Sequence, residues 1–176
     1  MSVRNGYGCR FAIVMTQKST TKTVKTWEVT TASVRFKIKN AGIPVTGTLQ
    51  DFEGSIQFDP AHLAESKLEG SVTTKSIDTA NTMRDFHLRM PDYFRAAKFP
   101  TITMQSTHIV EQSSGVFLGT FDISIKGKTK SLKIPFSFED QLFKAQFEIN
   151  RLDFGVGARS FVLGNQVKVM LEIAVD

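Results

Sequence analysis

Residues 76–106 read SIDTANTMRDFHLRMPDYFRAAKFPTITMQS and connect two segments in which apolar and polar residues alternate. The connecting residues 77–99 are far more numerous than the roughly two to five residues of an ordinary hairpin loop. Thr82 and Asp85 have the spacing of a capping box, which predicts that a helix begins here. Pro91 ends that helix, because proline lacks the amide proton that a helix interior needs. The stretch therefore predicts a short helical lid between two strands.

The apolar side chains of this segment fit two different roles. Met83, Phe86, Leu88 and Phe94 either close one end of a barrel over a ligand or plug the end of a solid core. The residues alone weight these alternatives about equally. Methionine tilts the balance slightly towards a ligand, because its flexible thioether adapts to partners of varied shape.

Away from this segment, alternation with a period of two indicates strands that have one buried face. The eight predicted strands lie at 33–39, 43–58, 68–76, 101–111, 116–126, 132–138, 143–149 and 167–175. The phase slips between Leu49 and Phe52, which predicts a bulge or a sharp bend inside the second strand. Long strands without heavily charged edges favour a closed barrel over a sandwich. We therefore expect an all-β, eight-stranded antiparallel barrel with the helical lid between strands 3 and 4.

The net charge of +5 is concentrated near the N-terminus. Residues 1–27 hold five basic residues and no acidic one, which leaves 17 basic and 17 acidic residues in 28–176. A nucleic-acid-binding domain carries its basic surface on the folded part, so no nucleic-acid partner is expected. The one basic cluster in the body is predicted to be a solvated turn and consists of Lys126, Lys128, Lys130 and Lys133.

Residues 1–24 are expected to lie outside the folded domain. Arg4 and Arg10 precede only five consecutive apolar residues, at 11–15, whereas an export signal has about 7–15. We expect a flexible tail or an incomplete export signal at 1–24 and the barrel at 25–176. Cys9 is the single cysteine, so packing rather than an internal disulfide must hold the fold.

Arg84, Asp85 and His87 invite a catalytic interpretation, because a carboxylate beside an imidazole can transfer protons. Helix capping and the helix dipole already explain Asp85. Arg84 is expected to pair with Asp78 or Asp92, and His87 to face away from its neighbours on the helix. The spacing of histidine and cysteine residues matches no metal motif. We expect no catalytic residue, no metal and no cofactor.

Several motifs, taken in order, resemble those of the YceI-like family. They are SVRF (33–36), PVTGTL (44–49), SIDT (76–79), RDFHL (84–88), DYF (92–94), KFP (98–100), TITMQS (101–106), ISIKGKTK (123–130) and FG (154–155). The signature residues of the lid segment are Asp78, Asn81, Arg84, Asp85 and His87. Leu49 and Met104 stand where the family more often has phenylalanine.

The resemblance implies a lipocalin-like barrel with an elongated apolar tunnel. It implies non-catalytic binding, storage or transport of a long-chain lipid, namely a polyisoprenoid, an isoprenoid quinone or a fatty-acid derivative. It also implies an exported bacterial protein, periplasmic or extracellular, although the incomplete signal leaves the cytoplasm open. A monomer or homodimer with peripheral membrane contact is expected.

The inward residues of the strands and the lid give the expected cavity wall. It consists of Phe36, Ile38, Val45, Phe58, Val72, Met83, Phe86, Phe94, Ile102, Met104, Phe121, Phe136, Phe138 and Phe147. Thr74, Ser76 and Ser106 either meet a head group or bond to the backbone. Two other functions stay open: an enzyme acting on a lipid or quinone in the same tunnel, and a protein-interaction module with a solid core.

Overall fold

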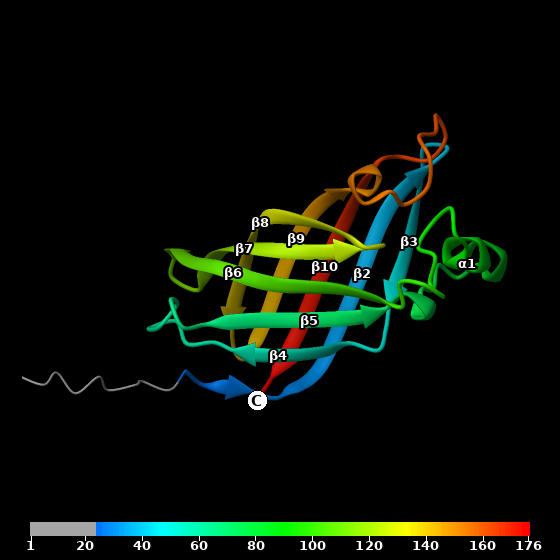
Figure 1. Ribbon diagram of the computed structural model, residues 1–176. Coiled ribbons are helices and arrows are strands. Elements are labelled where there is room, and N and C mark those ends of the chain that lie inside the picture. Colours follow the sequence, from blue (N-terminus) through cyan, green and yellow to red (C-terminus); the bar gives the residue numbers. More distant parts are fainter. Residues whose placement is uncertain (1–23) are drawn as a thin grey trace, which may run out of the picture.

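The computed structural model describes residues 24–176, so Cys9 and nearly all of the expected tail or export signal lie outside the described residues. Ten antiparallel strands form one curled sheet (Figure 1). The strands are β1 (Thr26–Trp27), β2 (Val29–Asn40), β3 (Ile43–Leu49), β4 (Glu53–Gln57), β5 (Lys67–Thr73), β6 (Thr101–Ser113), β7 (Val116–Ile125), β8 (Lys128–Glu139), β9 (Leu142–Asn150) and β10 (Gln166–Val175). The short helices are η1 (Thr74–Ser76), α1 (Thr82–Arg89) and η2 (Arg151–Phe154).

The order of the strands explains how the sheet curls into a barrel. It runs β1-β4-β5-β6-β7-β8-β9-β10-β2-β3, so the last strand of the chain pairs with the first long one. In Figure 1, β4 to β7 cross the molecule at an angle to β9, β10 and β2. Alternation sets the inner face: on β7, every second residue from Phe117 to Ile125 is buried. The predicted all-β antiparallel barrel is confirmed.

The predicted number of strands was eight, and the structure has ten. The predicted strand at 43–58 is divided into β3 and β4, because Asp51 adopts a left-handed conformation with φ of 55° and turns the chain. The Phe52 ring then lies against Gly54 and Gly70, where a side chain on either glycine would collide with it. The other additional strand is β1, which has only two residues and is too short to show an alternating pattern in the sequence.

Helix α1 lies in the predicted lid segment, but the predicted capping box is wrong by one residue. Asn81 is the N-cap, and its side chain accepts a hydrogen bond from the Arg84 amide at 3.0 Å. Asp85 therefore does not reach back to Thr82; it accepts from the amide of Thr79 at 3.0 Å. The helix ends at Arg89, before Pro91.

Phenylalanine rings fill one end of the barrel. Phe58 is fully buried, and its ring contacts four others at centroid distances of 5.1–6.0 Å, namely Phe117, Phe136, Phe138 and Phe143. These edge-on contacts suit the aromatic quadrupoles. Trp27 covers the cluster and donates from Nε1 to the Phe58 carbonyl at 2.8 Å. This end of the barrel is solid, and α1 lies at the other side of the molecule (Figure 1).

Candidate ligand-binding cavity

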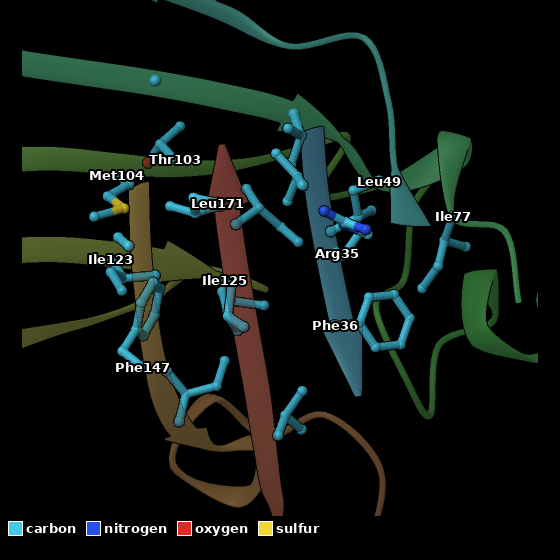
Figure 2. A pocket seen from close by; sticks show the side chains of 18 of the residues that line it. Arg35, Phe36, Leu49, Ile77, Thr103, Met104, Ile123, Ile125, Phe147 and Leu171 are labelled. Carbon is cyan, nitrogen blue, oxygen red and sulfur yellow. The ribbon is translucent and has the colours of Figure 1, made fainter. Parts of the chain in front are cut away.

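An apolar cavity of about 260 Å³ lies inside the barrel. Its surface is almost entirely apolar, and β2, β3, β5, β6, β7, β9 and β10 all contribute inward side chains. Figure 2 shows Phe36, Leu49, Met104, Phe147 and Leu171 around one common space. The size is close to the lower end of small-ligand sites, about 300 Å³.

The register of the strands makes the wall continuous. Val169 on β10 is paired with Phe36 on β2 and with Phe147 on β9, and all three residues line the cavity. Leu171, two residues further, is paired with Val34 and Ala145, which also line it. Directly paired residues point to the same face of a sheet, so the alternating apolar residues meet across three strands.

Ten of the fourteen residues expected on the wall lie there. They are Phe36, Ile38, Val45, Val72, Phe94, Ile102, Met104, Phe121, Phe136 and Phe147. Their contact with a ligand stays a prediction. The wall also includes residues that the sequence analysis did not select, among them Leu49, Ile77, Leu88, Tyr93, Ile123, Ile125, Leu163, Val169 and Leu171. The alternation of apolar and polar residues over 167–175 was a signal that could have placed Val169 and Leu171 on the wall.

Four expected wall residues lie elsewhere. Phe58 and Phe138 belong to the closed aromatic cluster, because rings from neighbouring strands meet them there. Met83 and Phe86 lie on α1 and are 67% and 53% exposed, because the helix turns a different face towards the barrel. Leu88 and Phe94, from the same lid segment, do reach the cavity.

A buried polar network fixes the start of the lid segment. Asp85 is buried and accepts from the Thr79 hydroxyl at 2.5 Å as well as from its amide. Arg84 donates from Nε to the Thr79 hydroxyl and from a terminal nitrogen to the Thr79 carbonyl, both at 2.7 Å. The expected pairing of Arg84 with Asp78 or Asp92 is therefore wrong, because Thr79 offers two nearer acceptors.

Of the other signature residues, Asp78 anchors the same segment and His87 does not. Asp78 exchanges two backbone hydrogen bonds with Thr48 on β3, at 2.8 and 3.1 Å, and its carboxylate accepts from the Ala80 amide at 2.8 Å. His87 lies exposed on α1, beside Phe86. The network thus holds Thr79, Arg84 and Leu88 at the cavity wall.

A buried arginine, Arg151, fixes the loop before β10 at another part of the wall. Arg151 donates from Nε to the Gly164 carbonyl at 2.8 Å and from its terminal nitrogens to the carbonyls of Val156 and Leu163, at 2.8 and 3.3 Å. Its fourth acceptor is the Asn165 side chain at 3.2 Å. Burial lowers the pKa of Arg151 from its ordinary value, because desolvation disfavours the charged form.

The basic cluster at the β7–β8 turn is only partly a solvated turn. Lys126 and Gly127 both have positive φ, as a two-residue hairpin turn requires. Lys126 is half-buried and donates to the carbonyls of Gly155 and Asp92, at 2.8 and 3.2 Å. Burial lowers the pKa of Lys126, although the Asp92 carboxylate acts in the opposite direction. Lys128, Lys130 and Lys133 are exposed.

The candidate polar residues inside the strands bond to the protein itself. The Thr74 hydroxyl donates to the Phe99 carbonyl at 2.8 Å, and the Ser76 hydroxyl donates to the Thr73 carbonyl at 2.7 Å. Ser106 accepts from the Leu68 amide at 2.9 Å. These three residues do not line the cavity, so their hydroxyl groups fit the role of bonding to the backbone rather than contact with a ligand head group.

The site offers apolar burial rather than a set of converging reactive groups. Asp85 is engaged by Thr79, whereas His87 is exposed to solvent. Within residues 24–176, no group of three or more histidine, cysteine, aspartate or glutamate side chains is placed to hold a metal ion. Over the same residues, no helix has the length and apolar character to cross a membrane.

The model of the YceI-like domain family matches residues 25–175. A UPF0312 protein of Vibrio cholerae serotype O1 (strain M66-2) is 30% identical over 145 residues, which are 74% of this chain and 77% of that protein. The crystal structure of Burkholderia cenocepacia BcnA has a TM-score of 0.76 at 22% identity and covers 81% of this chain and 94% of its own. A polyisoprenoid binding domain from Saccharophagus degradans, implicated in plant cell wall breakdown, has a TM-score of 0.65 at 11% identity, with 88% and 99% covered. At these identities the two structures show a shared fold.

Proposed function

Because this chain belongs to the YceI-like family, we propose that it binds a long-chain apolar lipid in its barrel and stores or transports it without chemical change. The ligand classes are a polyisoprenoid, an isoprenoid quinone and a fatty-acid derivative. The observation that carries the proposal is the cavity of about 260 Å³ with its almost wholly apolar wall.

Burial of hydrocarbon supplies the binding energy. Removing a methylene group from water is worth about 0.8 kcal/mol, so a ten-carbon stretch contributes roughly 8 kcal/mol before the costs of ordering. Met104 and the phenylalanine side chains of the wall would contact the hydrocarbon chain of the lipid along its length. The Saccharophagus degradans domain, named for polyisoprenoid binding, supports the first of the three ligand classes.

The polar groups on the wall favour a ligand that is mostly hydrocarbon with an uncharged head. All three nitrogens of the Arg151 guanidinium already donate to protein acceptors. Arg84 uses two of its nitrogens on Thr79. An anionic head group placed inside the cavity would have to compete with these bonds, at the cost of leaving buried carbonyls unpaired.

The two other functions have less support. An enzyme in the same cavity needs reactive groups on the wall, but His87 is exposed and Asp85 accepts two hydrogen bonds from Thr79 through Oδ1. A protein-interaction module with a solid core does not fit a barrel that is solid only at the Phe58 end.

Native mass spectrometry of the full chain, stripped of bound lipid on a hydrophobic resin, tests the proposal. The probes are a long-chain polyprenol, a long-chain ubiquinone and palmitic acid, with butyric acid as the short-chain control. We expect a one-to-one complex with at least one long-chain probe and none with butyric acid. A folded protein that takes up none of the three long-chain probes contradicts the proposal.

A further inference from the structure

We propose that an exposed apolar tip beside the cavity docks onto an anionic lipid bilayer. The apolar tip consists of Ile43, Phe161 and Val162. Phe161 is fully exposed, and Ile43 and Val162 are 67% and 55% exposed. The interaction surface goes beyond the lipid binding proposed above, because it concerns the outside of the barrel.

Backbone pairing brings the three tip residues together from two distant parts of the chain. Ala41, in the turn before Ile43, donates its amide to the Val162 carbonyl at 2.8 Å. Next to this bond, Asn40 forms a bridge with Leu163 and the Gly164 amide donates to the Lys39 carbonyl at 2.8 Å. Figure 1 shows the β2–β3 turn and the loop before β10 side by side at the upper right of the molecule.

Large apolar side chains in water are costly, and a cluster of them marks an interaction surface. The other exposed large apolar residues of the described chain lie on α1 and at β6–β7, namely Met83, Phe86, Val110 and Val116. The tip differs from both places because it combines a fully exposed phenylalanine with two further exposed aliphatic side chains. An aromatic ring and aliphatic side chains of this kind insert at the bilayer interface.

The charge around the tip selects an anionic membrane as the partner. Segments 37–44 and 154–171 contain four basic residues and no acidic residue. The four are Lys37, Lys39, Arg159 and Lys168. The body of the domain is neutral, with 17 basic and 17 acidic residues over 28–176, so this is a local excess. Apolar residues with basic neighbours are the composition of interfacial membrane anchors.

The tip adjoins the cavity wall. Asn40 and Leu163, which form the bridge behind the tip, both line the cavity, and Ile38 and Val45 line it on the adjacent strands. A bilayer at the tip would therefore face residues that line the cavity, which assigns this part of the barrel as the entrance for a lipid tail. This role as an entrance rests on the proposed function, whereas docking itself does not.

Vesicle flotation of the full chain tests the docking. The vesicles contain equal amounts of phosphatidylglycerol and phosphatidylcholine, with pure phosphatidylcholine as the neutral control. We expect the wild type to float with the anionic vesicles and to be released as salt screens the basic residues. Ile43→Ser, Phe161→Ser and Val162→Ser combined should lower binding roughly tenfold or more. Lys39→Gln with Arg159→Gln should lower it about 25-fold, at roughly fivefold for each charge.

Matched controls lie at the far side of the barrel. Val110→Ser with Val116→Ser alters the β6–β7 region, and Lys67→Gln alters the start of β5, both at the left of Figure 1. These variants should bind like the wild type, and every protein keeps the same residues 1–23. Docking is contradicted if the wild type does not float, if the tip variant floats equally well, or if the controls lose as much binding.

Two further readouts separate docking from its rivals. Light scattering after size exclusion shows whether the tip variants convert a dimer to a monomer; if they do so and no protein floats, the tip is a contact between copies and docking is wrong. Native mass spectrometry of the same samples reports cavity loading. Tip variants that load lipid but do not float support docking, whereas a wild type that floats but takes up no lipid contradicts the proposed function alone.

Discussion

The Phe36 ring on β2 lies directly over Gly47, its paired residue on β3. A Cβ on Gly47 would lie 2.8 Å from Cε1 of Phe36 and 2.9 Å from the Asp78 carbonyl oxygen. The missing side chain thus lets the ring reach the cavity wall while the lid segment pairs with β3 at Thr48.

Gly47→Ala should destabilise the domain by about 1–3 kcal/mol, because overpacking moves the ring and the backbone of the lid segment. Urea unfolding measures the change. The same substitution in a Phe36→Leu background should cost less, since the smaller side chain relieves part of the collision. Equal costs in both backgrounds would show that the ring does not depend on the glycine.

Asp85→Ala should destabilise the domain by about 1–3 kcal/mol, because the buried amide and hydroxyl of Thr79 lose their acceptor. Amide hydrogen exchange should show faster exchange at Thr79 and in α1. The matched change at the exposed neighbour, His87→Ala, should alter stability by less than about 0.5 kcal/mol. If His87→Ala instead abolished conversion of a lipid while leaving its binding intact, the enzyme alternative would be restored.

Arg151→Lys should be far from conservative. The planar guanidinium serves four acceptors, and a lysine ammonium has three donors with no fixed fork. We expect a loss of about 1–3 kcal/mol for the carbonyls left unpaired, together with faster proteolysis within residues 155–165. Arg159→Lys, on the exposed part of the same loop, is the control and should leave both measurements unchanged. Proteolysis at the wild-type rate in Arg151→Lys would contradict this role.

Ala145→Phe should reduce lipid uptake by filling the cavity. Ala145 lines the cavity on β9 between Phe136 and Leu171, where only a methyl group now projects. Gln146→Phe places the same ring on the exposed face of the same strand, so it should bind lipid like the wild type. Titration with the long-chain polyprenol, followed by native mass spectrometry, compares the two. Equal uptake by both variants would place the ligand outside the cavity.

The sequence was sufficient to predict the family, the all-β barrel and the position of the lid segment. The motifs predicted the YceI-like family, and the match over residues 25–175 confirms it. Alternation also placed residues such as Phe36, Phe121 and Phe147 on the inner face correctly, because strand geometry assigns successive side chains to opposite faces.

Alternation does not say how far along the barrel each inward residue lies. Phe58 and Phe138 face inwards, but rings from other strands meet them and close that end. The sequence also does not fix which side of helix α1 faces the barrel, because apolar residues occur on more than one side of this short helix. In the structure, Met83 and Phe86 face outwards. The Asn81 cap is a local contact with the Arg84 amide, and an asparagine directly before Thr82 was a signal that could have found it. The four acceptors of Arg151 lie in a loop that folds back onto it, so they depend on the folded chain.

The most direct test of the carrier function is native mass spectrometry of the full chain purified from its own host without detergent. The account predicts one tightly held, hydrocarbon-rich molecule per chain in the wild type, released by organic solvent and missing from Ala145→Phe. A wild type that emerges empty, and from which solvent extracts no such molecule, would contradict it.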